Sequence, residues 1–327
     1  MITHAEDDVV MLWRNEPSVI IGKNQNAFAE INFDFVKKHG IKVVRRMTGG
    51  GAVFHDLGNL NYTFISPAGG QMSEGIREGG LDFAYFTAPI ISALREISLD
   101  ASLSGRNDIV VATPDGERKI SGNAQCVLDG ATLHHGTLLF SAKLEKMSGA
   151  LNVDPTKLKS KGIASVRSRV ANIFDLMPED VQEKLCDVLD FEKFLADRLS
   201  KEFSAKTESL TDAMIREISL LAEKKYSTDE WNLRRFGNFA VERRRRFDYG
   251  AVEARFDVES GRIREISLGG DFFGELDIAE LEKMLSGVEY SREAVYAVLS
   301  EAQIGRFILG AVASDITDLL FFNESVL

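Results

Sequence analysis

A run of three glycines at residues 49–51 constrains the fold of this chain more than any other feature. It follows the short, β-branched segment 42–46 and precedes the strand-like residues 52–66, so we expect a strand, a turn and a returning strand. Consecutive glycines weaken a strand, because they lose backbone entropy and pack no side chain. Two interpretations are equally supported: a tight corner of a sheet, or a turn whose N–H groups bind an anion beside Arg45 and Arg46.

The composition excludes several classes of protein. The 327 residues are 44% hydrophobic and 27% charged, which is ordinary for a globular protein with one large and one small domain. The net charge of −11 argues against non-specific nucleic-acid binding. No apolar stretch reaches the length of a membrane span, and the first residues do not resemble a signal peptide. With two cysteines and no zinc-binding spacing, we expect a cytoplasmic protein that binds neither nucleic acid nor membrane.

A β-hairpin is predicted around Asp129-Gly130, because this dipeptide favours a two-residue turn. Counting back from the turn places Ala124 opposite His135, and Lys119 opposite Phe140. Strict alternation then puts Lys119 and His135 on different faces of the sheet.

The two side chains could share a site only if the strand carries a bulge. We predict that bulge at Gly122, where a glycine interrupts the strand.

Two polar segments have open interpretations. Residues 105–108 (GRND) precede a strand and form either a turn or a site for a metal ion or a ribose, with Asp108 as the candidate metal ligand. Residues 157–172 carry five basic side chains and no acid, in a chain that is strongly acidic overall. This second segment is either a solvated loop or a lid that orders over an anionic ligand.

The C-terminal part has its own pattern. Residues 249–258 alternate as a strand, 259–261 turn the chain, and 262–268 return as a second strand. Helical patterns follow at 277–285 and 292–304. We therefore predict two domains, residues 1–245 and 246–327, the second a small α+β module.

Several segments, in this order, resemble the lipoate–protein ligase A family. They are RRMTGGGAVFHD (45–56), GRNDIV (105–110), RKISGNAQ (118–125), HHGTLLF (134–140) and KGIASVRSRVANI (161–173), with GRIREISLGGDFF (261–273) resembling the family's C-terminal domain. The resemblance covers residues 9–175 through independent motifs. It implies an α+β fold with mixed sheets, of the biotin/lipoate-ligase type, and a small C-terminal accessory domain.

The resemblance also implies an activity. Members of this family use ATP to convert lipoate into lipoyl-adenylate with release of pyrophosphate. They then transfer the lipoyl group to a lysine of a carrier, either a lipoyl domain of a 2-oxoacid dehydrogenase E2 subunit or the glycine cleavage H protein. The sequence does not distinguish lipoate from octanoate as the preferred acid.

Site residues follow from the matching motifs. Lys119 is implied to bind both the lipoyl carbonyl and the α-phosphate. Contacts to the nucleotide and acyl phosphate are implied for Arg46, Gly49, Gly50, Gly51, Ala52, Val53 and Phe54, and contacts from the adenylate-binding loop for Lys161, Gly162, Ser165 and Arg167. The lipoyl pocket is implied to include Trp13, Thr48, Ala124 and His135, and Ile20 has a suitable apolar side chain.

These residue types suit the chemistry. A carboxylate and a triphosphate repel each other, so their reaction needs fixed cations and N–H donors in a dry site. Lys119, Arg46, the glycine turn and Mg²⁺ would supply them. The ammonium of Lys119 is a compact charge on a flexible stem, which can follow one oxygen through both half-reactions.

The chain departs from the family at its start, since members normally have a further strand and helix before the strand that carries Trp13. We expect a late start, a truncation or a partly open pocket. Two other functions stay open: an ATP-independent octanoyl or lipoyl transferase, for which Cys126 would be the candidate nucleophile, and a non-catalytic lipoate-binding homologue.

Overall fold

The computed structural model describes residues 7–74, 81–152, 170–233 and 239–321. Its strands are β1 (Val9–Trp13), β2 (Ser18–Ile21), β3 (Lys42–Arg45), β4 (Val53–His55), β5 (Asn59–Ser66), β6 (Ala101–Ser104), β7 (Asp108–Thr113), β8 (Gly116–Leu128), β9 (Ala131–Leu139), β10 (Val241–Phe247), β11 (Gly250–Glu259) and β12 (Arg262–Gly270). Its helices are α1 (Ala27–Glu30), α2 (Phe33–Lys38), α3 (Gln71–Glu74), α4 (Phe83–Glu96), α5 (Leu144–Ala150), α8 (Ile173–Leu176), α9 (Glu179–Gln182), α10 (Val188–Glu202), α11 (Asp212–Leu221), the π-helix η2 (Ala222–Tyr226), α12 (Asp229–Leu233), α13 (Ile278–Leu285), α14 (Arg292–Glu301), the 3₁₀ helix η3 (Ile304–Arg306) and α15 (Ala313–Leu320).

The chain divides into two compact units. The first unit comprises residues 1–20, 30–44 and 53–228, and the second comprises residues 21–29, 45–52 and 229–327. Two short N-terminal segments, one of which contains the glycine turn, are therefore grouped with the C-terminal residues. The predicted domain boundary after residue 245 falls within β10, which pairs with β11 over its whole length.

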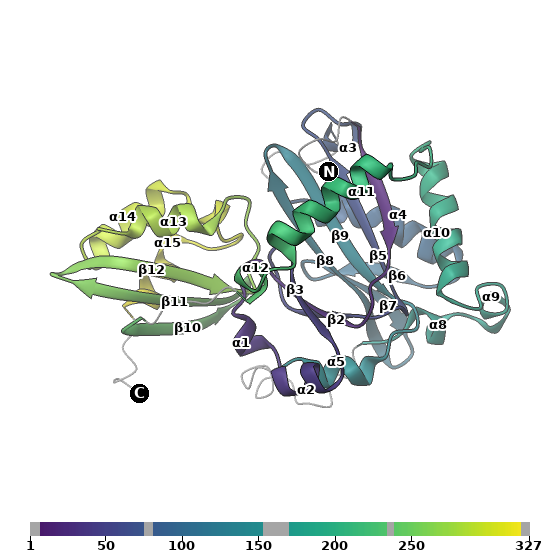
Figure 1. The fold of residues 1–327 in the computed structure, drawn as a ribbon, viewed down its shortest axis with the longest axis horizontal. Coiled ribbons are helices and arrows are strands. Elements are labelled where there is room, and N and C mark those ends of the chain that lie inside the picture. Colours follow the sequence, from purple (N-terminus) through teal and green to yellow (C-terminus); the bar gives the residue numbers. More distant parts are fainter. Residues whose placement is uncertain (1–6, 75–80, 153–169, 234–238, 322–327) are drawn as a thin grey trace. The chain divides into compact units, whose positions relative to one another are not determined.

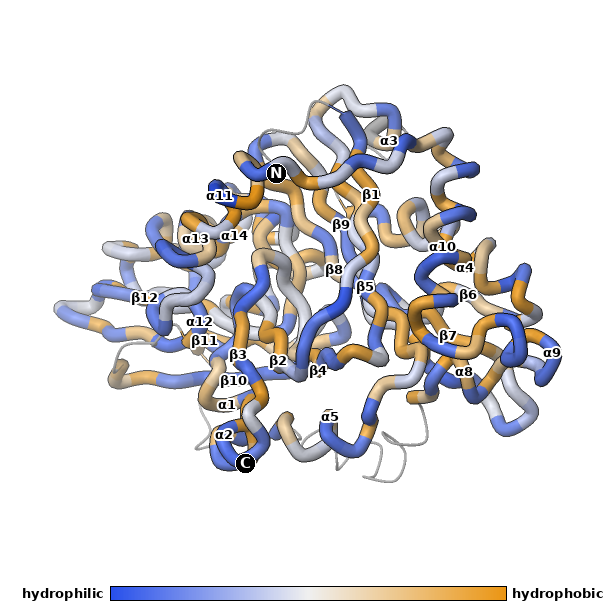
Figure 2. The backbone as a smooth tube through the Cα atoms, turned by 45° about the vertical axis from the view of Figure 1, so that its right-hand side comes forward, coloured by the Kyte–Doolittle hydropathy of each residue, from blue (hydrophilic) through white to orange (hydrophobic). Residues whose placement is uncertain are grey.

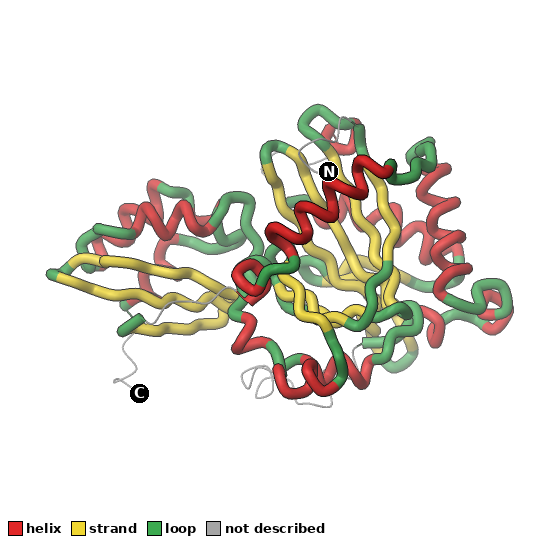
Figure 3. The backbone as a smooth tube through the Cα atoms, viewed as in Figure 1, coloured by secondary structure: helices red, strands yellow, loops and turns green. Residues whose placement is uncertain are grey.

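A six-stranded sheet organises the first unit. Its order is β1-β5-β9-β8-β7-β6, and every neighbouring pair is antiparallel (Figures 1 and 3). A three-stranded sheet, β3-β2-β4, is separate from it. The helices α4 and α10 contribute Phe86, Ile90, Phe191 and Leu195 to a core that also contains Phe64 of β5. Hydrophobic residues accordingly recur along α4 in Figure 2.

The second unit contains the sheet β10-β11-β12 and the helices α13, α14 and α15. Its core joins alternate residues of β11, such as Val252, Ala254 and Phe256, to the apolar faces of these helices. This arrangement confirms the α+β module that the alternating pattern predicts. The turn between β11 and β12 uses Ser260 and Gly261, both at positive φ, as a two-residue hairpin requires.

The predicted fold class is confirmed: the chain is a mixed α+β protein with antiparallel sheets. None of the helices formed by the described residues combines the length and the hydropathy needed to cross a membrane.

A buried histidine lies in the aromatic core of the first unit. The ring of His134 stacks on Phe86 with a centroid distance of 5.0 Å and also lies near Tyr62 and Phe64. Its Nδ1 is 3.4 Å from Oε1 of Gln125, and its Nε2 has no hydrogen-bond partner among the described residues. Burial lowers the pKa of His134 to about 3, because the charged ring would lose its hydration.

This pKa predicts that the folded state loses stability in acid. The unfolded chain binds a proton to residue 134 near pH 6.5, whereas the folded chain does not, so stability falls as the pH drops below 6.5. The expected slope from this group is ~1.4 kcal/mol per pH unit. Between pH 6.5 and pH 5, the free energy of unfolding measured with urea should therefore fall by about 2 kcal/mol less in His134→Phe than in the wild type. The exposed His39→Gln serves as the control and should keep the wild-type loss; an unchanged slope in His134→Phe contradicts the assignment.

Candidate functional site

Strand β8 changes its pairing partner at Gly122, and this change determines where Lys119 lies. Residues 116–122 pair with β7, and residues 123–128 pair with β9. The hairpin register is confirmed, with Ala124 opposite His135 and a turn at Asp129-Gly130 in which both residues have positive φ. The predicted pairing of Lys119 with Phe140 is wrong, because β8 has left β9 before it reaches Lys119, which pairs with Val110 of β7.

The predicted bulge exists, but two residues away from its predicted position. Opposite β7, Lys119 pairs with Val110 and Ser121 pairs with Ile109, so Ile120 is the extra residue. The prediction chose Gly122 because glycine is common at bulges, but Ile120 is instead fixed by its burial in the apolar core.

The bulge at Ile120 brings Lys119 to the same face of the sheet as Ala124 and His135. Side chains two residues apart share a face, so Gly122, Ala124 and the paired His135 lie together. Asp108 pairs with Gly122 and joins the same face. The extra residue shifts Lys119 to this face. Lys119 and His135 therefore lie on the same face of the sheet, as a shared site requires.

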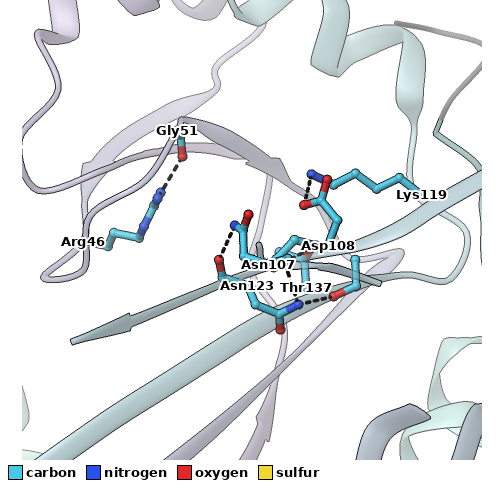
Figure 4. A network of polar contacts seen from close by, with 9 residues as sticks. Arg46, Gly51, Asn107, Asp108, Lys119, Asn123 and Thr137 are labelled. Carbon is cyan, nitrogen blue, oxygen red and sulfur yellow. Dashed lines mark hydrogen bonds and ion pairs between the residues drawn. The ribbon is translucent and has the colours of Figure 1, made fainter. Parts of the chain in front are cut away.

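An ion pair fixes the end of the Lys119 side chain. Its Nζ lies 2.7 Å from Oδ1 of Asp108, and both side chains are about one-third exposed (Figure 4). A Cβ atom added at Gly122 would lie 3.3 Å from this Nζ, so the ammonium group passes directly over the glycine. The absent side chain of Gly122 leaves room for the ammonium group.

Asn107 and Asn123 tie the start of β7 to β8. Asn107 donates from Nδ2 to the carbonyl of Asn123 at 2.7 Å, and Asn123 donates from Nδ2 to the carbonyl of Asn107 at 3.0 Å (Figure 4). The hydroxyl of the buried Tyr62 donates to Oδ1 of Asn123. Asn107 therefore has a structural role: it holds the segment immediately before Asp108 against β8.

The three glycines of the turn have different surroundings, all within the second unit. A Cβ atom at Gly49 would lie 2.4 Å from the carbonyl oxygen of Phe272, and one at Gly50 would lie 2.8 Å from the ring of Phe273. Gly50 also has a φ of +90°, which favours glycine. No atom of the described residues lies within 4 Å of the Cβ position of Gly51. The chain itself therefore requires glycine at 49 and 50, whereas it leaves open space at 51.

The side chain of Arg46 forms hydrogen bonds to the residues of the glycine turn. Its guanidinium group donates to the Thr48 hydroxyl at 3.0 Å and to the carbonyl of Gly49 at 2.7 Å. It also donates to the carbonyl of Gly51 at 2.8 Å (Figure 4). Burial, with a smaller contribution from the Arg45 charge, lowers the pKa of Arg46 to about 10, so the group stays cationic at neutral pH. Arg46 thus places a positive charge directly behind the glycine turn.

Arg45 has a structural role that the sequence did not reveal. The side chain is 2% exposed and donates to the carbonyls of Gly22, Lys23 and Gln25 and of Trp231. It therefore joins the loop after β2 to α12. Adjacent arginines in a sequence cannot be told apart by type, and only the buried environment separates Arg45 from Arg46.

The other residues implied to line the lipoyl pocket each have defined surroundings within their own unit. In the first, Trp13 donates from Nε1 to the Thr63 hydroxyl at 2.9 Å, and Ile20 is buried and pairs with Val53. Phe54, which is implied to contact the nucleotide, is buried too. In the second unit, Thr48 is fully buried beneath the turn. The candidates Lys161, Gly162, Ser165 and Arg167 lie outside the described residues.

Asp108 is the predicted metal ligand. Among the described residues, no three His, Cys, Asp or Glu side chains gather as a metal cluster. Magnesium in nucleotide enzymes is commonly held by one or two carboxylates together with substrate phosphates, so a single carboxylate is compatible with this metal. The Oδ1 atom of Asp108 pairs with Lys119, and about one-third of the Asp108 side chain is exposed.

Two domain families match the chain. The model of the lipoyl protein ligase A/B catalytic domain matches residues 2–199, and that of the bacterial lipoate protein ligase C-terminus matches residues 237–320. The chain is 38% identical to lipoate-protein ligase LplJ of Bacillus subtilis over 322 residues, which cover 97% of this chain and 92% of the relative. It is 39% identical to lipoate–protein ligase 1 of Staphylococcus aureus over 297 residues, which cover 91% of this chain and 86% of the relative.

Solved structures agree with these matches. Plasmodium falciparum LipL1 in complex with lipoate has a TM-score of 0.69 and 26% identity, covering 90% of this chain and 82% of its own. A bipartite lipoate protein ligase of Thermoplasma acidophilum, reported with its E2 lipoyl domain, has a TM-score of 0.58 and 32% identity, covering 72% and 87%. Lipoate-protein ligase A bound with ATP has a TM-score of 0.54 and 30% identity, covering 69% and 85%.

Proposed function

The chain belongs to the lipoyl protein ligase A/B family, and from this premise we propose that it is an ATP-dependent lipoate–protein ligase. The observation that carries the proposal is the placement of Lys119. A bulge at Ile120 turns its ammonium group to the sheet face that holds Ala124 and His135, two residues implied to line the lipoyl pocket. A family relative bound with ATP and another in complex with lipoate support the two substrates.

The first half-reaction joins the two substrates. A carboxylate oxygen of lipoate attacks the α-phosphorus of ATP, the bond from this phosphorus to the bridging oxygen breaks, and pyrophosphate leaves. We propose that Lys119 binds the carboxylate and the α-phosphate. Its positive charge reduces the repulsion between the two anions and stabilises the negative charge of the transition state. The open space at Gly51 and the cationic Arg46 behind it support a role for the turn, with Ala52, Val53 and Phe54, in nucleotide binding.

The second half-reaction transfers the lipoyl group. The neutral amine of a carrier lysine attacks the acyl carbon, AMP leaves, and the amine releases its proton to solvent. Lys119 remains on the acyl oxygen and stabilises the negative charge that develops there. A covalent enzyme intermediate is not needed, so Cys126 has no role in this scheme.

Magnesium would accompany ATP. We propose that Asp108 is the carboxylate that contributes to its binding, together with the phosphates. When bound, the ion would neutralise phosphate charge and assist pyrophosphate as a leaving group.

The partner and location of the protein are inferred from the same family. A relative studied with its E2 lipoyl domain supports a lipoyl domain as the carrier, and we include the glycine cleavage H protein and octanoate as further substrates to be tested. We propose a cytoplasmic enzyme with a catalytic domain at residues 1–245 and an accessory domain at 246–327. The segment that contains Lys161, Gly162, Ser165 and Arg167 is proposed to bind the adenylate.

A pyrophosphate-release assay tests this proposal. Lipoate, octanoate and biotin are each supplied with ATP, and release is expected with lipoate or octanoate and not with biotin. A chain that binds lipoate but releases no pyrophosphate, with or without a carrier, would be a non-catalytic homologue, and the proposal would be wrong.

A further inference from the structure

We propose that Asp108 is a positioning residue, which holds the ammonium group of Lys119 ready for the adenylation step. The inference rests on the proposed function and adds a residue role to it. The Oδ1 atom of Asp108 lies 2.7 Å from Nζ of Lys119, so the two charges form a close ion pair. Figure 4 shows the two side chains directed at each other from neighbouring strands.

A lysine needs such a partner more than an arginine would. The lysine side chain is a flexible four-carbon stem, and fixing it in one conformation costs about 2 kcal/mol of rotamer entropy. If the side chain were free in the resting enzyme, this ordering would have to occur during the reaction. With Asp108 in place, the ammonium group is already oriented before the substrates bind, as electrostatic preorganisation requires.

Asp108 itself is held rigidly through its neighbour. Asn107 and Asn123 exchange hydrogen bonds between side chains and carbonyls, and the backbone N–H of Asn123 also donates to the Asn107 carbonyl at 2.9 Å. Tyr62, with no exposed surface, donates to Asn123 from the core. A buried anchor therefore fixes the residue directly before Asp108, and the carboxylate has a defined position.

Gly122 completes the arrangement. It pairs with Asp108 across the strands, and its Cβ position lies 3.3 Å from Nζ of Lys119 and 3.9 Å from Oδ1 of Asp108. A methyl group here would require the ammonium group to shift by a few tenths of an ångström. The bulge at Ile120 brings Lys119 over this glycine.

The ammonium group of Lys119 has enough hydrogen-bond donors to contact Asp108, the acyl oxygen and the α-phosphate at the same time. Lysine has three N–H donors and no acceptor. One donor serves Asp108, which leaves one for the acyl oxygen and one for an oxygen of the α-phosphate. The ion pair therefore persists while both substrates bind, and the carboxylate directs the remaining two donors.

The test measures pyrophosphate release by Asp108→Ala, Asp108→Asn and Gly122→Ala, with kcat and KM for ATP determined separately. We expect kcat of Asp108→Ala to fall about 10–100-fold, because misplacing a catalytic group by about 1 Å has an effect of this size. At saturating Mg²⁺, where the proposed metal role of Asp108 no longer limits binding, KM for ATP should change less than threefold. Asp108→Asn keeps an acceptor for Lys119 and should recover part of kcat, and Gly122→Ala should lose several-fold in kcat with an unchanged Tm.

Controls separate this role from others. Asp115→Ala removes an exposed acid from the turn between the same two strands and should retain wild-type kcat. A loss in Asp108→Ala that disappears at high Mg²⁺ concentration would assign Asp108 to the metal alone and overturn the inference, as would wild-type kcat in Asp108→Ala. If the wild-type chain itself releases no pyrophosphate, the proposed function fails before the inference is reached.

Discussion

Lys119→Ala should reduce ATP- and lipoate-dependent pyrophosphate release by about 10²–10³-fold, the effect of removing one preorganised donor from a developing charge. The ammonium group is the cation that the sheet directs to the face shared by Ala124 and His135. Its removal also leaves the Asp108 carboxylate without its ion-pair partner, which adds a negative charge where two anions must meet. Release is measured under saturating lipoate and ATP.

Lys42→Ala is the matched control for this variant. Lys42 also forms an ion pair, with Glu16 at 2.8 Å, but both side chains are about 70% exposed. We expect wild-type activity from it, because exposed ion pairs contribute little. If Lys119→Ala and Lys42→Ala have the same activity, Lys119 does not bind the reacting groups.

Gly51→Ala should leave stability unchanged and lower activity, whereas Gly50→Ala should lower stability. A side chain at residue 50 would have a positive φ and would lie 2.8 Å from the Phe273 ring, so we expect a loss of about 2–4 kcal/mol in unfolding free energy. At residue 51 the added methyl group meets no atom of the described chain within 4 Å. It would occupy the space that we assign to the nucleotide, so we expect ATP affinity to fall about 10–100-fold.

Thermal unfolding and ATP titration of the two variants decide between the original interpretations of the glycine run. A sheet corner alone requires glycine at 49 and 50, and then Gly51→Ala binds ATP as the wild type does. An anion-binding turn makes Gly51→Ala a stable protein that binds ATP poorly. Gly40→Ala is a useful reference for stability, since Gly40 has a φ of +62° and open space around it.

Local sequence signals predicted part of the fold well. Asp129-Gly130 determined the hairpin and its register, because two residues at positive φ allow only one pairing of the flanking strands. The alternation of Val252, Ala254 and Phe256 predicted β11, because side chains two residues apart lie on the same face of a strand. Long-range pairing also shapes this part of the chain, since Ile31, between the short helices α1 and α2, pairs with Leu151 from a distant segment.

The site was less accessible to sequence reasoning where it depends on long-range contacts. The bulge at Ile120 results from the packing of an apolar side chain into the core, and no local signal distinguishes it from a bulge at Gly122. Asp108 was predicted as a metal ligand, and its ion pair with Lys119 became visible only once β7 and β8 were aligned. The requirement for Gly49 and Gly50 comes from Phe272 and Phe273, more than 200 residues later in the chain.

Mass spectrometry of the wild-type enzyme shows whether the chain makes lipoyl-adenylate without a covalent enzyme intermediate. The protein is mixed with lipoate and ATP without a carrier, and the bound small molecules and the intact protein mass are both recorded. The account predicts lipoyl-adenylate and pyrophosphate, formed only when both substrates are present, and an unmodified protein. An acyl adduct on Cys126, or the absence of lipoyl-adenylate when both substrates are present, would contradict this mechanism.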